Sequence, residues 1–240
     1  MTDKETHDGS TPPRGRDSSR SDVVRRVIGG CVAAAVVVVL VLRTPDNGWG
    51  WTIWFVSAAG VAVIRAPFAR QTQDNTITDD RQGTGESMLL ALVGFAGGLV
   101  PLVHLLTGVF GFADYDMSSW SYAVGAVLVA LGLWLFWRSH ADLGRNWSVT
   151  LQIRDEHTLT TTGVYARVRH PMYTSLLLIY AATPLVLHNW IAGWTGLIGF
   201  VILCVARIPH EEAMMRTHFG ESYVRYSERT GRLLPPLSTD

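Results

Sequence analysis

Six long apolar runs constrain the fold of this 240-residue chain more than any other feature: Val27–Leu42, Trp49–Ile64, Met88–Phe112, Trp120–Trp137, Tyr173–Leu187 and Trp190–Ala206. A helix needs about 20 apolar residues, within a range of about 17–25, to cross a bilayer. The shorter runs reach this length only if flanking Arg, Trp and Tyr side chains extend to the interface. The pattern predicts an all-α integral membrane protein, a bundle of six transmembrane helices or, alternatively, of five.

Composition divides the chain into three parts. Residues 1–21 are polar and lack apolar periodicity, which predicts a disordered cytoplasmic tail. We expect two additional transmembrane helices and a loop over residues 22–87, and a membrane core over residues 88–240. Only His188 and Asn189 separate the last two apolar runs, which predicts a tight helical hairpin.

The placement of arginine predicts the orientation, because Lys and Arg are enriched in cytoplasmic loops. One set of loops holds Arg43 alone, together with acidic Asp46, Asp114 and Asp116. Both termini are therefore predicted to face the cytoplasm. If the chain is bacterial, the membrane is the plasma membrane. The arginines assigned to the cytoplasmic side are Arg25, Arg26, Arg65, Arg70, Arg81, Arg138, Arg145, Arg154, Arg167, Arg169, Arg207, Arg216, Arg225, Arg229 and Arg232.

Charge and motif content exclude several classes of function. The 20 basic and 20 acidic residues give no net charge, which argues against a nucleic-acid partner because phosphate binding needs a basic surplus. Cys31 and Cys204 both lie inside apolar runs, where we interpret them as packing residues. No His, Cys or carboxylate cluster has metal-ligand spacing, so no metal is expected. Membrane lipids are the expected surroundings.

A dense polar segment adjoins the fifth apolar run. It contains Thr162-Gly163-Val164-Tyr165, then Arg167, and then Arg169-His170-Pro171-Met172-Tyr173. Proline disfavours helical geometry at the residue before it but is tolerated in a first turn, so a helix is predicted to begin at Pro171. Its positive dipole end suits a carboxylate, and the two tyrosines can stack on an aromatic ring or a cation. The two arginines alone are typical of a membrane interface, whereas the whole string indicates a binding site for a polar small molecule.

A second polar cluster closes the last apolar run. Arg207 and Glu211 have the i,i+4 spacing that places two side chains on one helix face. Pro209 lies between them, so the helix either kinks or restarts there. An interfacial ion pair with a snorkelling arginine is the alternative to a functional site. Beyond it, Gly220 fits a helix C-cap, and Tyr223 and Tyr226 are interpreted as structural residues that pack a C-terminal arm.

Together the two clusters resemble the C-terminal core of the isoprenylcysteine carboxyl methyltransferase family of integral membrane enzymes, over about residues 143–236. The connector Leu143-Gly144-Arg145-Asn146-Trp147 and the segment beginning at His157 carry the resemblance further. The resemblance implies that Arg207 contacts the substrate and that Glu211 binds the amino group of S-adenosylmethionine. Ser175 departs from the family, which commonly has glycine there, although serine is small enough for close helix packing. The other cofactor-binding residues implied are Gln152, His157, Thr158, Leu159, Thr160, Tyr165, His170, Pro171, Met172 and Tyr173.

The function implied is S-adenosylmethionine-dependent methyl transfer to a lipophilic acceptor from the bilayer, above all a carboxylate such as isoprenylcysteine or another lipid, at the cytoplasmic membrane edge. A carboxylate needs no general base and can be held by an arginine. Membrane sterol reductases share a similar His-Pro-x-Tyr turn but bind NADPH, so an NADPH-dependent reductase is the alternative enzyme. A non-catalytic membrane scaffold is the third hypothesis.

Overall fold

The computed structural model describes residues 37–39, 41–42, 48–71, 77–80, 84–144, 152–154 and 158–236. The chain divides into two compact units, Met1–Arg43 and Thr44–Asp240. In the first unit, the described residues 37–39 and 41–42 are helical and form part of the first predicted span. The predicted tail over residues 1–21, Cys31 and His157 lie outside the described residues, and the predicted boundaries at residues 21 and 87 stay predictions.

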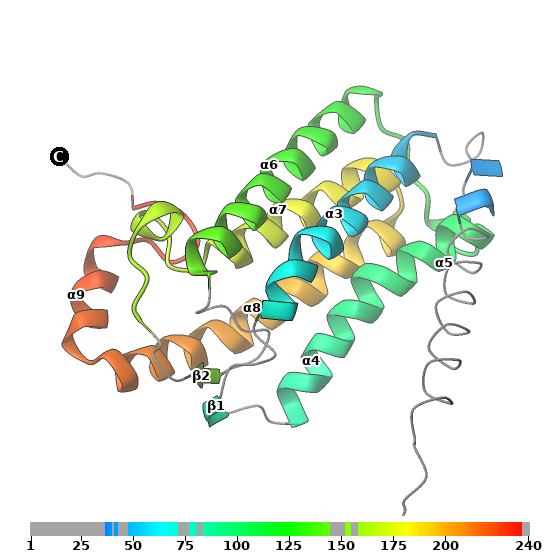
Figure 1. Cartoon of the computed structure of the whole chain (residues 1–240). Coiled ribbons are helices and arrows are strands. Elements are labelled where there is room, and N and C mark those ends of the chain that lie inside the picture. Colours follow the sequence, from blue (N-terminus) through cyan, green and yellow to red (C-terminus); the bar gives the residue numbers. More distant parts are fainter. Residues whose placement is uncertain are drawn as a thin grey trace, which may run out of the picture. The chain divides into compact units, whose positions relative to one another are not determined.

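The second unit is a helical bundle (Figure 1). The π-helical turn η1 joins α4 to α5, so the third predicted run is one interrupted helix. The run predicted over Trp49–Ile64 extends to Gln71, and Arg65, interpreted from the sequence as a loop residue, lies inside this helix. The helices are α3 (Gly50–Gln71), α4 (Thr84–Gly94), η1 (Phe95–Leu99), α5 (Val100–Thr107), η2 (Gly111–Ala113), α6 (Trp120–Leu143), η4 (Gly163–Ala166), α7 (Pro171–Leu187), α8 (Trp190–Phe219) and α9 (Glu221–Arg229).

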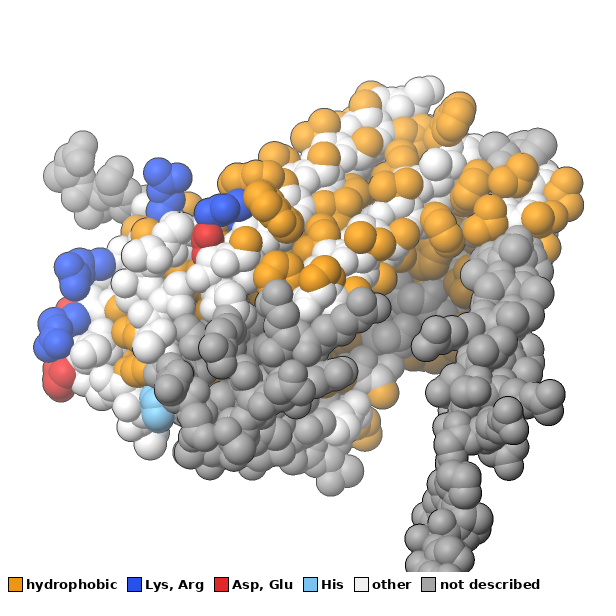
Figure 2. Space-filling view, viewed as in Figure 1, with side chains coloured by type: hydrophobic (Ala, Val, Ile, Leu, Met, Phe, Trp, Pro, Cys, Tyr) orange, Lys and Arg blue, Asp and Glu red, His pale blue; other side chains and the backbone are white. Residues whose placement is uncertain are grey.

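Four described stretches are long and apolar enough to cross a membrane: Gly50–Phe68, Gly85–Thr107, Trp120–Leu143 and Trp190–Phe219. The shorter apolar helix α7 has 17 residues. On the face shown in Figure 2, hydrophobic side chains lie along the length of the bundle, whereas the charged side chains lie mainly at the end that carries α9. The predicted helical membrane fold is confirmed, and the protein is a multi-pass membrane protein.

Glycines allow the helices to approach closely. A side chain at Gly132 of α6 would meet the backbone oxygen of Ser175 in α7 at 2.9 Å. A side chain at Gly60 of α3 would meet Leu133 of α6 at 2.8 Å. Small residues at such crossings are typical of membrane helices, whose packing rests on close van der Waals contact. Ser175 is itself fully buried, so the serine fits the tight crossing as the sequence predicted.

A buried cluster on α8 ties the remaining helices to this core. Phe200, Leu203, Cys204 and Ile208 pack against Leu89, Leu90 and Val93 of α4 and against Tyr173, Leu176, Leu177 and Tyr180 of α7. Cys204 is a free, buried thiol, as expected for a packing residue. α4 therefore belongs to the same core as the predicted site helices.

A short antiparallel ladder supplements the helices. Strand β1 (Ile77–Asp80) pairs with strand β2 (Gln152–Arg154), with Asp80 opposite Gln152. These strands were not predicted, because three or four residues are too few for an alternating pattern to stand out. The ladder joins the loop before α4 to the connector after α6.

Candidate functional site at one end of the bundle

The α7–α8 hairpin brings the two predicted clusters level with each other. Asn189 begins α8, and its side-chain oxygen accepts hydrogen bonds from the backbone N–H groups of Ile191 and Ala192. At a rise of about 1.5 Å per residue, His170 and Glu211 lie about 28 Å and 33 Å from this turn. Both therefore reach the far edge of a hydrocarbon layer about 30 Å thick. The helix α8 runs through Pro209 without a restart.

Arg207 and Glu211 share one face of α8, as predicted from their spacing. Arg207 Nε donates to Glu211 Oε1 over 2.8 Å, and the Tyr173 hydroxyl donates to the same oxygen over 2.6 Å. The second Arg207 contact joins Nη1 to Glu86 Oε1 over 3.1 Å. The Glu86, Glu211 and Arg207 side chains are largely buried, so these charges interact with little screening by water.

His170 lies between the two adjacent glutamates of α8. Its Nδ1 atom lies 3.5 Å from Glu211 Oε2, and its Nε2 atom lies 3.4 Å from Glu212 Oε1. Burial lowers the pKa of His170, but hydrogen bonds and charge attraction to the two glutamates outweigh burial and raise the pKa above its usual range. Only the imidazolium form donates from both ring nitrogens, so this geometry favours the charged histidine.

Glu212 holds the C-terminal arm against the start of α7. Arg169 Nε donates to Glu212 Oε1 over 3.1 Å, and Arg232 Nη2 donates to Glu212 Oε2 over 2.8 Å. Arg169 also donates to the backbone oxygens of Ser227 and Thr230. Arg169 is therefore a structural clamp and not an exposed interface residue. The side chains of Arg169 and Glu212 are 10% and 5% exposed, so this pair is buried, whereas Arg232 is half exposed.

The Gly-Val-Tyr segment forms the short helix η4, which packs on the end of α6. Gly163 has φ +61°, and a side chain there would meet Asp142 Oδ2 at 2.1 Å, so this position requires glycine. The same Asp142 oxygen accepts the backbone N–H of Val164 over 2.9 Å. Tyr165 is buried, and its backbone oxygen accepts the hydroxyl of Tyr226 over 2.7 Å. Tyr226 therefore packs the C-terminal arm against the connector, as predicted.

The structure brings part of the predicted site together. Arg207, Glu211, His170 and Tyr173 are in direct contact, and Tyr165 lies within electrostatic range of Glu211. Pro171 is buried at the first position of α7, as predicted, and Met172 follows it half-buried. Thr158 is exposed, whereas Leu159 and Thr160 are half-buried in the segment before η4. Gln152 lies in the β-ladder, opposite Asp80.

Two functional candidates were missed in the sequence. Glu86 is one carboxylate partner of Arg207, and Asp142 fixes the start of η4. Glu86 stands just before an apolar run, where an ionisable residue is a functional candidate by default, so this sequence signal was present but unused. The role of Asp142 depends on a contact between residues 22 positions apart, which the sequence alone does not reveal.

The sequence of this chain is similar to those of known membrane methyltransferases. A model of the phospholipid methyltransferase family matches residues 120–222. A "probable protein-S-isoprenylcysteine O-methyltransferase" of Oryza sativa subsp. indica is 31% identical over 157 residues, which cover 65% of this chain and 82% of the rice protein. The chain belongs to the protein-S-isoprenylcysteine O-methyltransferase family. It is a methyltransferase.

Two further similarities extend this result. Protein-S-isoprenylcysteine O-methyltransferase B of Arabidopsis thaliana is 28% identical over 139 residues, covering 57% of this chain and 71% of the plant protein. The solved structure of the eukaryotic intramembrane Ras methyltransferase, an isoprenylcysteine carboxyl methyltransferase, matches with a TM-score of 0.55 and 21% identity. That match covers 85% of this chain and 75% of the solved one, so this methyltransferase has the same membrane fold.

Proposed function

We propose that this methyltransferase transfers a methyl group from S-adenosylmethionine to the carboxylate of a lipophilic, isoprenylcysteine-like acceptor at the cytoplasmic membrane edge. The observation that carries the proposal is the contact of Glu211 with Arg207 and Tyr173 at the level where α7 begins. This cluster combines a buried carboxylate for an ammonium group with a buried guanidinium for a carboxylate. The arginine-rich loops support a cytoplasmic location for this end and for both termini.

The residues at this end fit the chemical groups of the proposed cofactor. Glu211 Oε1 accepts from Arg207 and Tyr173, whereas Oε2 has, among the described residues, only His170 at 3.5 Å. Oε2 therefore keeps accepting capacity for the ammonium of an amino acid. The N-cap residue His170 makes no capping hydrogen bond with its side chain, which leaves the positive dipole end of α7 for a carboxylate. These residues support a cofactor that carries both groups of an amino acid.

In the proposed reaction, the chain chiefly binds and aligns. S-adenosylmethionine, when bound, supplies an electrophilic methyl group with a good leaving group already attached. Arg207 binds the acceptor carboxylate by charge-assisted hydrogen bonds, and a guanidinium has five donors with which to do so alongside its contacts to Glu86 and Glu211. An acceptor carboxylate attacks as the anion, so the site needs no base. Exclusion of water and alignment of the reacting atoms lower the barrier.

The test is a calorimetric titration of the full chain, purified in detergent, with S-adenosylmethionine and separately with NADPH. We expect S-adenosylmethionine to bind and NADPH not to bind, and we expect Glu211→Ala to lose binding. Glu221→Ala is the matched control, because Glu221 is an exposed acid in the first turn of α9. Binding of NADPH instead would move the protein to the reductases, and binding of neither would support the scaffold hypothesis.

A further inference from the structure

Arg65 is a cation inside a membrane-spanning helix that the site described above does not use. It lies on α3, close to the end of the Gly50–Phe68 span. Its Cζ atom lies 5.5 Å from the ring centroid of Phe136, a fully buried residue of α6. The Nε atom is buried and has no hydrogen-bond partner among the residues that the structure describes. A guanidinium in this environment is costly unless an anion or another acceptor contacts it.

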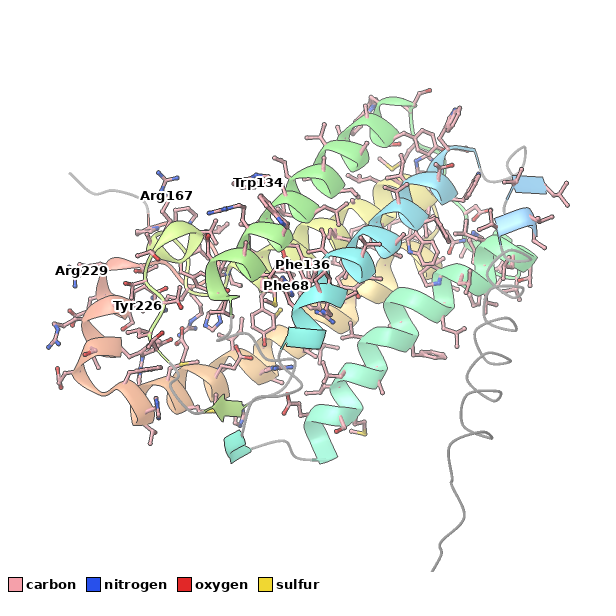
Figure 3. All side chains as sticks on the ribbon, in the orientation of Figure 1. Phe68, Trp134, Phe136, Arg167, Tyr226 and Arg229 are labelled. Carbon is pink, nitrogen blue, oxygen red and sulfur yellow. The ribbon has the colours of Figure 1, made fainter. Side chains whose placement is uncertain are left out.

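The residues near Arg65 include Arg207 of the proposed site. Arg65 is close enough to Tyr180 of α7 and Arg207 of α8 for their charges to interact. The rings of Phe68 and Phe136 both lie against His140, at 5.2 Å and 4.3 Å between centroids. Figure 3 shows the two labelled phenylalanines near the place where α3 crosses α6. Arg65 is therefore a partly buried cation that lies over Phe136, within electrostatic range of Arg207.

The two arginines differ in their partners. Arg207 contacts the carboxylates of Glu86 and Glu211, at 3.1 Å and 2.8 Å, whereas Arg65 has an aromatic face and no carboxylate within salt-bridge distance among the described residues. Among the described residues, Arg65 is therefore a partly buried cation that no carboxylate neutralises. A bound anion would relieve both the missing hydrogen bond of Nε and the repulsion between the two guanidinium groups.

We propose that Arg65 is a specificity-determining residue that binds the anionic head of the acceptor together with Arg207. α3 would thus supply a binding residue to the core, and the enzyme would select acids over neutral molecules with the same apolar tail. The inference rests on the proposed function, since it names how the acceptor carboxylate is recognised. It predicts a stronger preference for acids than Arg207, already paired with two carboxylates, provides alone.

The test measures methyl transfer to an N-acetylated S-isoprenylcysteine acid by the detergent-purified full chain at saturating S-adenosylmethionine. We expect Arg65→Gln to raise KM for the acid at least about tenfold, with a smaller change in kcat, and Arg65→Lys to restore part of the affinity. Arg225→Gln, which removes an exposed arginine of α9, is the control and should leave KM unchanged. An unchanged affinity for S-adenosylmethionine in each variant shows that the site has folded.

A binding measurement without turnover separates the possible outcomes. The wild type should bind the acid more tightly than its neutral methyl ester, and Arg65→Gln should lose most of this preference. An unchanged KM and acid preference in Arg65→Gln would overturn the inference and leave the proposed function intact. A loss of binding only to phosphatidylglycerol vesicles would overturn it in favour of a lipid phosphate. A wild type that binds S-adenosylmethionine but methylates no acid would refute the proposed function, and the inference with it.

Discussion

At one end of the bundle, Asn189 donates to the backbone oxygen of Phe110 and to Asp114, and accepts two backbone N–H groups of α8. At the other end, Glu86, Arg207 and Glu211 bring three ionisable groups into buried contact. Both ends lie at the edge of the same apolar bundle. At the Asn189 end a mainly neutral side-chain network closes the loops, whereas at the Glu211 end buried charges are concentrated. A closed neutral network stabilises a fold, and concentrated buried charges are typical of a functional site.

The difference recurs between two neighbouring glutamates. Glu212 is bound by Arg169 and Arg232 and holds the C-terminal arm, whereas one oxygen of Glu211 has only a long contact with His170 in the part of the chain that the structure describes. We therefore expect Glu212 to stabilise the fold and Glu211 to bind the cofactor. Variants at each end, and at each of these glutamates, should separate loss of stability from loss of function.

The largest expected effect follows from removing the guanidinium of the site. Arg207→Gln should lower kcat/KM for methyl transfer by about 100-fold or more, because it deletes the group proposed to bind the acceptor and leaves Glu86 and Glu211 buried without it. Initial rates against acceptor concentration check this. Arg216→Gln, at an exposed arginine on the same helix, is the control. Retention of wild-type kcat/KM in Arg207→Gln would contradict the assignment.

The clamp should respond differently from the site. Glu212→Gln should lower the free energy of unfolding by about 3–5 kcal/mol, because it leaves Arg169 without its buried counter-charge. Thermal or chemical unfolding in detergent measures the loss, with Glu228→Gln on the exposed face of α9 as the control. If stability stays at the wild-type value while S-adenosylmethionine affinity falls, Glu212 rather than Glu211 is the binding carboxylate.

The opposite end should lose stability without losing function. Asn189→Ala removes a helix cap and two further hydrogen bonds at a fully buried position, so it should cost about 2 kcal/mol or more of unfolding free energy. Calorimetric titration of the folded variant should give the wild-type S-adenosylmethionine affinity. A weakened affinity for S-adenosylmethionine at an equal folded fraction would show that the two ends are energetically coupled.

His170 should make stability depend on pH. Its pKa is raised in the folded protein relative to an unfolded value of about 6.5. The contribution of His170 to the free energy of unfolding is therefore fully present below about pH 6.5. It is lost as the pH rises through the higher pKa of the folded state. The free energy of unfolding of the wild type should decline as the pH rises across this range. The decline should be absent in His170→Gln and present in His218→Gln, which changes an exposed histidine. The same decline in His170→Gln would assign the pH dependence to another group.

The smallest effects come from a matched pair of tyrosines. Tyr226 donates to the Tyr165 backbone oxygen and Tyr115 donates to the Pro184 backbone oxygen, each over 2.7 Å. Replacing either by Phe should cost about 1 kcal/mol of stability. Only Tyr226→Phe should also weaken S-adenosylmethionine binding, by about threefold, because Tyr165 belongs to the proposed site. Equal S-adenosylmethionine affinities in the two variants would remove Tyr165 from it.

Local rules predicted much of this architecture. Asn189 in the hairpin, Pro171 at the start of α7 and Gly220 at the end of α8 each follow from the conformational preferences of their residue types. The Arg207–Glu211 contact follows from helical spacing, and α8 remains continuous because packing carries the helix through Pro209.

The remaining features depend on contacts between distant segments. Glu86 meets Arg207 only after α4 has packed on α8, and Arg65 reaches Phe136 only because glycine at position 60 lets α3 approach α6. The ion pair between Glu212 and Arg232 likewise depends on the return of the C-terminal arm to the start of α7. A single sequence carries no periodicity or spacing that predicts such pairs.

The chemical identity of the methylated product tests the proposed reaction. The wild type and Glu211→Gln should be incubated with methyl-labelled S-adenosylmethionine and an N-acetylated S-isoprenylcysteine acid. We expect the wild type to form a base-labile methyl ester that releases labelled methanol, and the variant to form none at the same cofactor concentration. A base-stable product on a phospholipid amine, or an equal yield of ester from Glu211→Gln, would contradict the account.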